Sequence, residues 1–363
     1  MLRICVLALL LVATAATAQA PGDAQLDAVV GNLMRARRIV GAAVAVVRDG
    51  RVIAARAYGD AKQGREPARP DTVFYMDSTT KQFTAAGIML LVQQGRIGLD
   101  DPVRKYLPDA PASWNPIRIR HLLTHTAGFA HDPPSYPTIP VQNCQPGAML
   151  EQLFRMAPRT PPGTAWAYSN AGYATLASIL EKVTGGCYFE FMRTHVFGPL
   201  AMERTQLALY ANWREPGHAA GYNVTPQGVR EQDPVAHALG GGGIASTVLD
   251  LAKWDAALYG TSILTDASKT AMWTPFTLPD GKSTNYGFGW EIARTPIGTL
   301  VHHNGGGFGF STAIYRYVDA KLTVIVLTNT IWRDGPKPAN NGDAIAHAVA
   351  PLYAPKLPRP AAN

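Results

Sequence analysis

The sequence predicts an α/β fold of the α+β kind, in which an antiparallel sheet built from both chain ends is flanked by helices and carries a mostly helical insertion. Strand-like runs lie towards the two ends of the chain, whereas helical segments broken by prolines fill its middle. Short turns join the terminal strands, so neighbouring strands should run in opposite directions. We therefore expect one domain over 19–363, with an α/β part over 24–77 and 245–350 and a helical part over 78–244.

The first elements are an amphipathic helix and a hairpin. Apolar residues recur at helical spacing over 24–38, which predicts the helix. The apolar runs 42–47 and 52–55 flank Asp49-Gly50, a pair that favours positive φ at both turn positions and therefore predicts the hairpin.

The remaining elements follow the same rules of periodicity and capping. A helix should begin at Ser78 and end at Gly95, and another should begin at Ser246 or Thr247 and end at Gly260. Further helices are expected over 117–125, 148–156, 171–184, 187–195 and 341–350, and strands over 286–293, 299–304, 309–317 and 322–329.

The first twenty residues have the pattern of a secretory signal peptide. A positive start at Arg3 precedes an apolar run over 4–12 and then small residues, and we expect cleavage after Ala18, which makes 1–18 the signal peptide. The alternative is an uncleaved anchor, but the run is shorter than the ~20 apolar residues that a membrane span needs. The mature chain is therefore expected to be periplasmic or secreted, with no membrane span.

Composition narrows the function classes. Hydrophobic residues make up 47% of the chain and charged residues 16%, which is typical of a globular enzyme and excludes wholesale disorder. The net charge is +7, but the basic residues are scattered, so no nucleic-acid partner is expected. After export Cys144 and Cys187 can form a disulfide, although the sequence leaves their pairing open.

The first candidate catalytic pair is Ser78 and Lys81. A serine that opens a helix, with lysine three residues later, places both side chains on one face about a turn apart. An alkyl hydroxyl needs a neighbouring base to become a nucleophile, and a buried lysine with a lowered pKa can serve. The helix N-terminus also places the backbone N–H of Ser78 where an oxyanion would form.

The second candidate group is Tyr168-Ser169-Asn170. The phenol of Tyr168 can relay a proton, and the amide of Asn170 can hold a substrate carbonyl or the lysine. The tripeptide lies between a Pro- and Gly-containing loop and an apolar helical run, so we place it at a loop-to-helix corner. A similar tripeptide at 210–212 has no such frame and is not chosen.

The third candidate group begins at His303 and continues into glycines. Gly305 and the two following glycines would let a substrate lie against the strand backbone, and the N–H of Gly306 would complete an oxyanion hole. His303 is a candidate substrate-binding residue, and the alternative is a packed strand histidine.

Two other readings of the histidines are rejected. His121 and His125 are four residues apart on an expected helix, but no Glu follows His121 and no third ligand is evident, so we expect no metal and treat both as structural. The run that starts at His303 is similar to the oxyanion glycines of lipase-type α/β-hydrolases, but no Gly-x-Ser-x-Gly elbow follows.

Taken together, the motifs resemble the serine β-lactamase and penicillin-recognising peptidase group, in its class C branch. The resemblance runs from about residue 40 to 330 in the order expected of that group. It rests on 72–84 with Ser78 and Lys81, Leu99-Asp100-Asp101-Pro102-Val103, His121-Leu122-Leu123-Thr124-His125-Thr126-Ala127-Gly128, Pro162-Gly163-Thr164 with Tyr168-Ser169-Asn170, and Tyr286-Gly287-Phe288-Gly289-Trp290.

The resemblance implies a β-lactamase/transpeptidase-like fold and a set of roles without a cofactor. Ser78 would be acylated, Lys81 and Tyr168 would share the proton transfers, Asn170 would orient the substrate, and the N–H groups of Ser78 and Gly306 would form the oxyanion hole. His303 stands where classical members carry the lysine of Lys-Thr-Gly. The resulting His-x-Gly motif is similar to that of the esterase, D-aminopeptidase and general-hydrolase members of the group. Weak or no β-lactamase activity is therefore expected.

Two hypotheses remain from different classes. The first is an exported serine hydrolase that cleaves an ester, an amide or a D-amino-acid peptide bond in a small molecule or short peptide. The second is a catalytically idle sensor or scaffold that uses the same cleft. The intact set of Ser78, Lys81, Tyr168 and Asn170 favours the hydrolase.

Overall fold

The computed structural model describes residues 23–132, 147, 149–208, 212–232, 240–332 and 340–359. The helices are α1 (Asp23–Arg37), α2 (Lys81–Gln93), α3 (Ile119–Leu123), α4 (Leu150–Phe154), α5 (Asn170–Thr184), α6 (Tyr188–Met192), α7 (Val248–Ala257), α8 (Asp266–Met272) and α9 (Asn341–Tyr353). The strands are β1 (Gly41–Arg48), β2 (Arg51–Lys62), β3 (Glu66–Pro67), β4 (Phe74–Tyr75), β5 (Gln206–Leu207), β6 (Gly221–Thr225), β7 (Gly228–Gln232), β8 (Ile244–Ser246), β9 (Glu291–Thr295), β10 (Gly298–Gly307), β11 (Phe310–Tyr317), β12 (Leu322–Thr328) and β13 (Thr330–Trp332).

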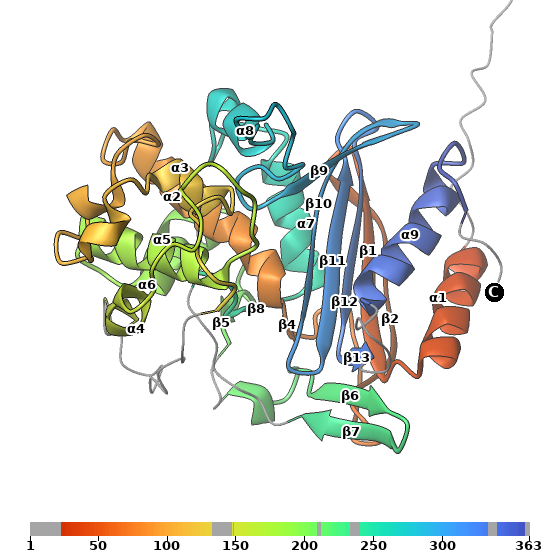
Figure 1. The fold of residues 1–363 in the computed structure, drawn as a ribbon. Coiled ribbons are helices and arrows are strands. Elements are labelled where there is room, and N and C mark those ends of the chain that lie inside the picture. Colours follow the sequence, from red (N-terminus) through yellow and green to blue (C-terminus); the bar gives the residue numbers. More distant parts are fainter. Residues whose placement is uncertain are drawn as a thin grey trace, which may run out of the picture.

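The two ends of the chain build one seven-stranded sheet. Its strand order is β3-β2-β1-β12-β11-β10-β9, and each neighbouring pair runs antiparallel. The N-terminal strand β1 pairs with the C-terminal strand β12, with Ala42 opposite Thr328. The antiparallel sheet made from both chain ends is therefore confirmed (Figure 1).

Alternate residues of the central strands belong to two different cores. Val44 and Val46 of β1 pack in a cluster with α1 and α9 on one face, whereas Ala43 and Ala45 belong to a larger cluster on the other. A strand buried on both faces needs an unbroken apolar run, because successive side chains point to opposite sides. Figure 1 shows α1 and α9 covering one face and α7 with the helical part lying on the other.

The helical part holds α2, which carries the candidate nucleophile at its start. Ten of the thirteen residues of α2 are buried, and the helix packs against α5, α6 and α8. Gln82 ties the first turn to α7, because its Oε1 accepts a hydrogen bond from Trp254 Nε1 at 2.7 Å. Packing on all sides holds the first turn of α2 in a defined place relative to the sheet.

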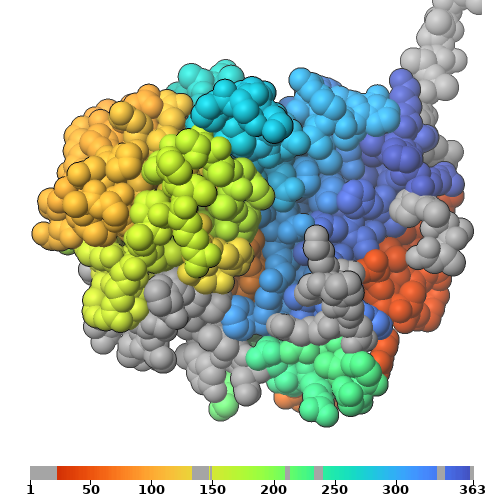
Figure 2. Space-filling model, viewed as in Figure 1, coloured from red at the N-terminus to blue at the C-terminus, as the bar shows by residue number. Residues whose placement is uncertain are grey.

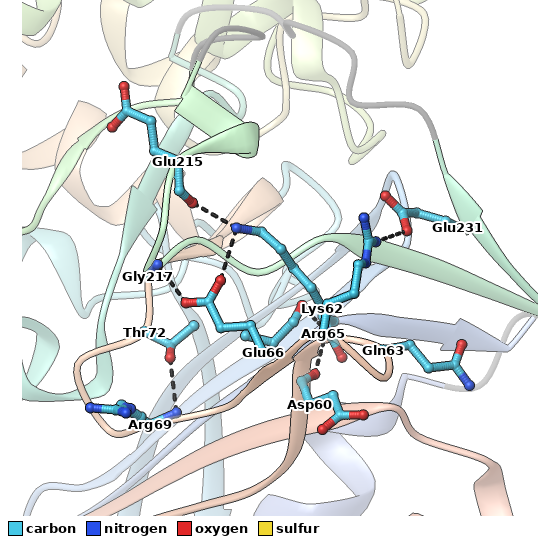
Figure 3. Close-up of polar contacts among 12 residues, drawn as sticks. Asp60, Lys62, Gln63, Arg65, Glu66, Arg69, Thr72, Glu215, Gly217 and Glu231 are labelled. Carbon is cyan, nitrogen blue, oxygen red and sulfur yellow. Dashed lines mark hydrogen bonds and ion pairs between the residues drawn. The ribbon is translucent and has the colours of Figure 1, made fainter.

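The region expected to be helical also contains strands. β6 and β7 form a hairpin within the predicted helical part, and β6 pairs in parallel with β13. Figure 3 shows how polar contacts tie this region to the turn between β2 and β3: Lys62 Nζ reaches Glu66 at 3.0 Å and the carbonyl of Glu215 at 2.7 Å, and Arg65 forms an ion pair with Glu231.

The strand expected over 286–293 begins later, at Glu291. Gly289 adopts φ +75°, and an added Cβ would lie 2.6 Å from the carbonyl oxygen of Lys81. The segment before β9 is therefore shaped by its close approach to α2 rather than by strand pairing.

Some expectations concern residues outside the described part of the chain. The signal peptide over 1–18, Tyr210 and Cys144 all lie there. Cys187 is disulfide-bonded, and its pairing with Cys144 stays a prediction. Among the described residues, no helix is both long and apolar enough to cross a membrane.

Candidate active site

Ser78 lies at the start of the helical part, in the short helix η1 (Asp77–Thr80) that leads directly into α2. The N–H groups at such a helix start have no acceptor within the helix, so that of Ser78 is available to a ligand. The preceding Asp77 has φ +49°, and its Oδ1 accepts a hydrogen bond from the Ser78 hydroxyl at 3.0 Å.

Lys81 is completely buried beside the serine. Its Nζ atom lies 3.2 Å from Ser78 Oγ, 2.7 Å from Asn170 Oδ1 and 2.7 Å from the carbonyl oxygen of Gly241. Burial lowers the pKa of Lys81 to about 7, although the negative charges of Asp77 and Asp132 oppose this shift. A large fraction of the side chain is therefore a neutral amine near neutral pH.

The contacts of Lys81 leave one direction for the nucleophile. The carbonyl of Gly241 and the oxygen of the Asn170 amide only accept hydrogen bonds, so each takes one N–H of the amine. The third direction of the amine points to Ser78 Oγ at 3.2 Å, and in the neutral amine a lone pair there can accept the serine proton once the hydroxyl turns from Asp77 Oδ1, to which it donates in this structure. The geometry thus fits removal of the serine proton by the lysine.

Tyr168 completes the group of three side chains predicted to act on the proton. The Nζ atom of Lys81 lies 4.7 Å from the centroid of its ring, and Tyr168 lines the same cleft as Ser78. Burial raises the pKa of Tyr168 well above its ordinary value, and hydrogen bonding with Ser78 opposes this shift. The phenol therefore keeps its proton and is suited to donate it.

Asn170 is the first residue of α5, directly after the N-cap Ser169, whose side chain accepts from the N–H of Gly172. The loop-to-helix corner expected for this tripeptide is confirmed. The amide of Asn170 holds Lys81 through Oδ1 and donates from Nδ2 to Asp132 Oδ1 at 2.9 Å. Of the two partners that the sequence suggested for it, the structure brings it to the lysine.

The glycines of β10 lie against the backbone of the nucleophile. An added Cβ at Gly305 would collide with the carbonyl oxygen of Met76 and lie 3.1 Å from the N atom of Ser78. An added Cβ at Gly306 would make only ordinary van der Waals contacts, at 3.6 Å to Asn340 and 3.7 Å to Ile331, and Gly306 lines the cleft. β9 pairs with β10 only as far as His302, so the edge of β10 beyond it carries no β9 partner.

His303 is buried behind the cleft. Its ring is 1% exposed, with Nδ1 donating to the carbonyl of Asn304 at 2.6 Å and Nε2 accepting from the Tyr286 hydroxyl at 2.9 Å. Burial lowers the pKa of His303 to about 3, so the ring is neutral. Both nitrogens are occupied, which favours a packed strand histidine. Its contact with substrate stays a prediction.

His125, expected to be structural, supports the tyrosine. Its ring centroid lies 4.2 Å from that of Tyr168, and its Nδ1 accepts from the N–H of Ser169 at 3.0 Å. His121 is turned elsewhere, since its Nδ1 accepts from the N–H of Arg118 at 3.2 Å. Within the described ranges no group of three or more His, Cys, Asp or Glu side chains is placed to hold a metal ion.

Ser78 and Tyr168 line a cleft of about 400 Å³ between the helical part and the sheet. In Figure 2 the surface of residues around 150–175 (yellow-green) meets that of the C-terminal strands (blue). The cleft is lined by Ser78, Tyr168, Asn304, Gly306, Ser311, Ile331, Asn340 and Asp343.

Sequence reasoning missed several contributors to this site. Asp77 was passed over although it adjoins the nucleophile, and Gly241 was not considered as a site residue. Asp132 and Asp343 had no local signal, because they reach the site through the fold. Adjacency to Ser78 was the one cue that would have revealed Asp77.

Comparisons with known proteins agree with this geometry. Penicillin-binding protein 4* of Bacillus subtilis (strain 168) is 34% identical over 286 residues, which cover 73% of this chain and 62% of that protein, so the chain spans less than two thirds of its length. Esterase EstB of Burkholderia gladioli is 29% identical over 376 residues, covering 89% and 94% of the two chains.

The fold has a close counterpart among solved structures. The octameric penicillin-binding protein homologue from Pyrococcus abyssi superposes with a TM-score of 0.79 at 27% identity, covering 93% of this chain and 78% of that one. The sequence profile described as Beta-lactamase matches residues 26–349. With Ser78 and Lys81 meeting at the start of α2 and the profile spanning nearly the whole described chain, the protein belongs to the beta-lactamase family of serine hydrolases.

Proposed function

We propose that the chain is an exported hydrolase that forms a covalent acyl-enzyme on Ser78 and cleaves an ester, an amide or a D-amino-acid peptide bond. The observation that carries the proposal is the buried amine of Lys81, 3.2 Å from Ser78 Oγ with its other two directions occupied by carbonyl oxygens. Relatives named as a penicillin-binding protein and an esterase support this range of substrates. Export rests on the pattern of the first twenty residues.

Acylation begins with proton removal. The neutral amine of Lys81 takes the hydroxyl proton of Ser78 as Oγ attacks the substrate carbonyl carbon and the carbonyl electron pair moves onto oxygen. The N–H groups of Ser78 and Gly306 donate to that oxyanion, and one such donor is worth about 10²–10³ in rate. Collapse of the intermediate breaks the bond to the leaving group and leaves the acyl group on Ser78.

The leaving group needs a proton as it departs. Tyr168 has a phenol that stays protonated, and its ring lies 4.7 Å from Nζ of Lys81. The phenol donates its proton to the leaving group and recovers one from the ammonium of Lys81. A water molecule then attacks the acyl-enzyme while Lys81 takes one of its protons. Lys81 passes that proton to Ser78 Oγ as the acyl bond breaks, which releases the acid and restores the serine.

β-Lactams fit this cleft poorly. Their carboxylate is met in classical members by the lysine that His303 replaces, and His303 is neutral and buried. No lysine or arginine stands among the described residues that line the cleft, whereas Asp343 does. A substrate carboxylate therefore finds no countercharge there, and weak or no β-lactamase activity follows.

Intact-protein mass spectrometry with a fluorophosphonate tests the proposal. We expect one covalent adduct on wild type and on Ser113→Ala, a matched change at an exposed serine, and none on Ser78→Ala. Turnover of p-nitrophenyl esters should fall to background in Ser78→Ala. An adduct without turnover of any ester, amide or peptide would favour the idle sensor instead, and unchanged turnover by Ser78→Ala would refute the proposed nucleophile.

A further inference from the structure

A carboxylate borders the same cleft as the nucleophile. Asp343, near the start of α9, lines the cleft together with Asn304 of β10 and Asn340, and the acyl-transfer steps use none of the three. We propose that Asp343 forms a subsite for a positively charged nitrogen, so that the chain prefers ester or amide substrates that carry an ammonium group. This inference rests on the proposed function, because it concerns the substrate of the same serine.

The carboxylate is held in one orientation. Asp343 Oδ2 accepts from Asn304 Nδ2 at 2.7 Å, and Oδ1 accepts from the Tyr315 hydroxyl at 3.0 Å. The N–H of Asp343 donates to Oδ1 of Asn340 at 2.9 Å, which fixes the first turn of α9. Each carboxylate oxygen has two lone pairs, so both retain accepting capacity after these contacts.

The charge of Asp343 is left without a strong counterion. Its two side-chain partners are a neutral phenol and a neutral amide. Among the described residues, the titratable groups that act on it otherwise are His347 and the carboxyl of Glu291. Burial raises the pKa of Asp343, whereas its hydrogen bonds with Tyr315 and Asn304 and the charge of His347 lower it. The net pKa of Asp343 stays raised, so burial still disfavours its negative charge. A cation bound beside Asp343 would offset that cost.

Helix capping accounts for only part of this arrangement. An acidic residue in the first turn of a helix interacts favourably with the helix dipole, and α9 begins with Asn340 as N-cap and Asp343 three residues later. That role is fulfilled on any exposed helix start. It does not require the carboxylate to line a cleft shared with Ser78 or to be braced by residues from β10 and β11.

The cleft pattern along β10 supports the assignment. Asn304 and Gly306 are two residues apart, so they lie on one face of the strand and both line the cleft. Gly306 supplies the proposed oxyanion donor, and Asn304 contacts Asp343. The carboxylate is therefore linked through one strand face to the place where the scissile carbonyl would lie.

The test compares charged substrates with neutral ones of the same shape. One arm uses choline esters against 3,3-dimethylbutyl esters, which places the charge on the leaving group. A second arm uses p-nitrophenyl esters of 4-(trimethylammonio)butanoic acid against those of 5,5-dimethylhexanoic acid, which places it on the acyl group. We expect kcat/KM to favour the cation in at least one arm by about tenfold to hundredfold, through attraction between the two charges alone, because a quaternary ammonium group has no N–H to donate.

Asp343→Asn should bring the ratio of kcat/KM for cationic over neutral esters close to one, at whatever rate it turns over the neutral esters. Asp71→Asn, at an exposed position that does not line the cleft, is the matched control and should keep the wild-type ratio. Fluorophosphonate labelling of Ser78 and thermal unfolding establish that the Asp343 variant is folded.

The outcomes separate this inference from the proposed function. Two outcomes would overturn the subsite alone. The first is turnover of the neutral esters with no preference for a cation in either arm, and the second is a cation preference that persists in Asp343→Asn. Absence of both labelling at Ser78 and turnover of the neutral esters would instead overturn the proposed function.

Discussion

The Nζ atom of Lys81 lies 3.2 Å from the Oγ atom of Ser78, and no part of the lysine side chain is exposed. Two carbonyl oxygens, from Asn170 and Gly241, take the other two directions of the amine. The reactivity of Ser78 therefore depends on the protonation state of the Lys81 amine. The pH dependence of the reaction rate reports on that protonation state.

Activity should rise with pH through the titration of Lys81. Its pKa lies at about 7, and only the neutral amine accepts a proton, so kcat/KM for a neutral ester should climb about tenfold per unit below that value and level off above it. Asp77 raises the pKa of Lys81 by its charge, so Asp77→Asn should move the midpoint to lower pH, whereas Asp71→Asn should leave it in place. A flat profile from pH 5 to 9 would contradict the assignment of the base.

Tyr168→Phe should slow turnover without unfolding the protein. The change removes the phenolic proton but keeps the ring that lies against His125 at 4.2 Å, so we expect kcat to fall by about 10²–10⁴ with little effect on thermal stability. Tyr317→Phe removes a hydroxyl from the core on the far face of the sheet and should keep full activity. Wild-type kcat in Tyr168→Phe would exclude the phenol from proton transfer.

Gly289→Ala should damage the site through the backbone of α2. Gly289 has φ +75°, and a Cβ there would lie 2.6 Å from the carbonyl of Lys81. Gly64 has φ +65° with nothing within 4 Å of the added Cβ, so Gly64→Ala measures the conformational strain alone, about 1–2 kcal/mol. Urea unfolding and ester turnover should show a larger stability loss and lower kcat only in Gly289→Ala. Equal losses in the two variants would mean that the close approach carries no cost.

A buried ion pair beneath the sheet should dominate stability rather than catalysis. Asp255 of α7 accepts from Arg316 Nε at 2.6 Å, and the two side chains are 2% and 0% exposed. Asp255→Ala leaves the arginine charge buried without its partner, which should lower the free energy of unfolding by about 3–5 kcal/mol. Glu190→Ala removes a carboxylate from an ion pair with Arg193 in which both side chains are more than half exposed, and should cost at most about 1 kcal/mol. Urea titration checks both, and a small loss in Asp255→Ala would contradict the prediction.

Local chemistry in the sequence predicted the elements whose signals are contiguous. Asp49 and Gly50 adopt φ +50° and +72°, as the hairpin between β1 and β2 required, and Thr247 caps α7 through the N–H of Asp250. Ser78 and Lys81 were identifiable because their spacing alone brings them together. Each of these depends on residues within a few positions of one another.

Long-range contacts could not be obtained in the same way. The partners of Lys81 at Asn170 and Gly241 are 89 and 160 residues away, so only the assembled fold shows that they hold the amine. The segment before β9 was misassigned because its glycines serve a close approach to α2, a purpose that strand propensity does not reveal. The β6–β7 hairpin was missed because its anchoring partners lie far away, around Lys62 and Glu66.

The pairing of β1 with β12 also dictates when the sheet can close during synthesis. Thr328, the neighbour of Ala42, is synthesised 286 positions after it, so one edge of β1 has no strand partner until β12 has been made. Contacts between residues so far apart in the sequence slow folding, and they prolong the time during which aggregation-prone apolar strands are exposed. Nascent chains arrested before β12 should therefore remain unfolded at their N-terminal strands and depend on chaperones, whatever the helical part has already formed.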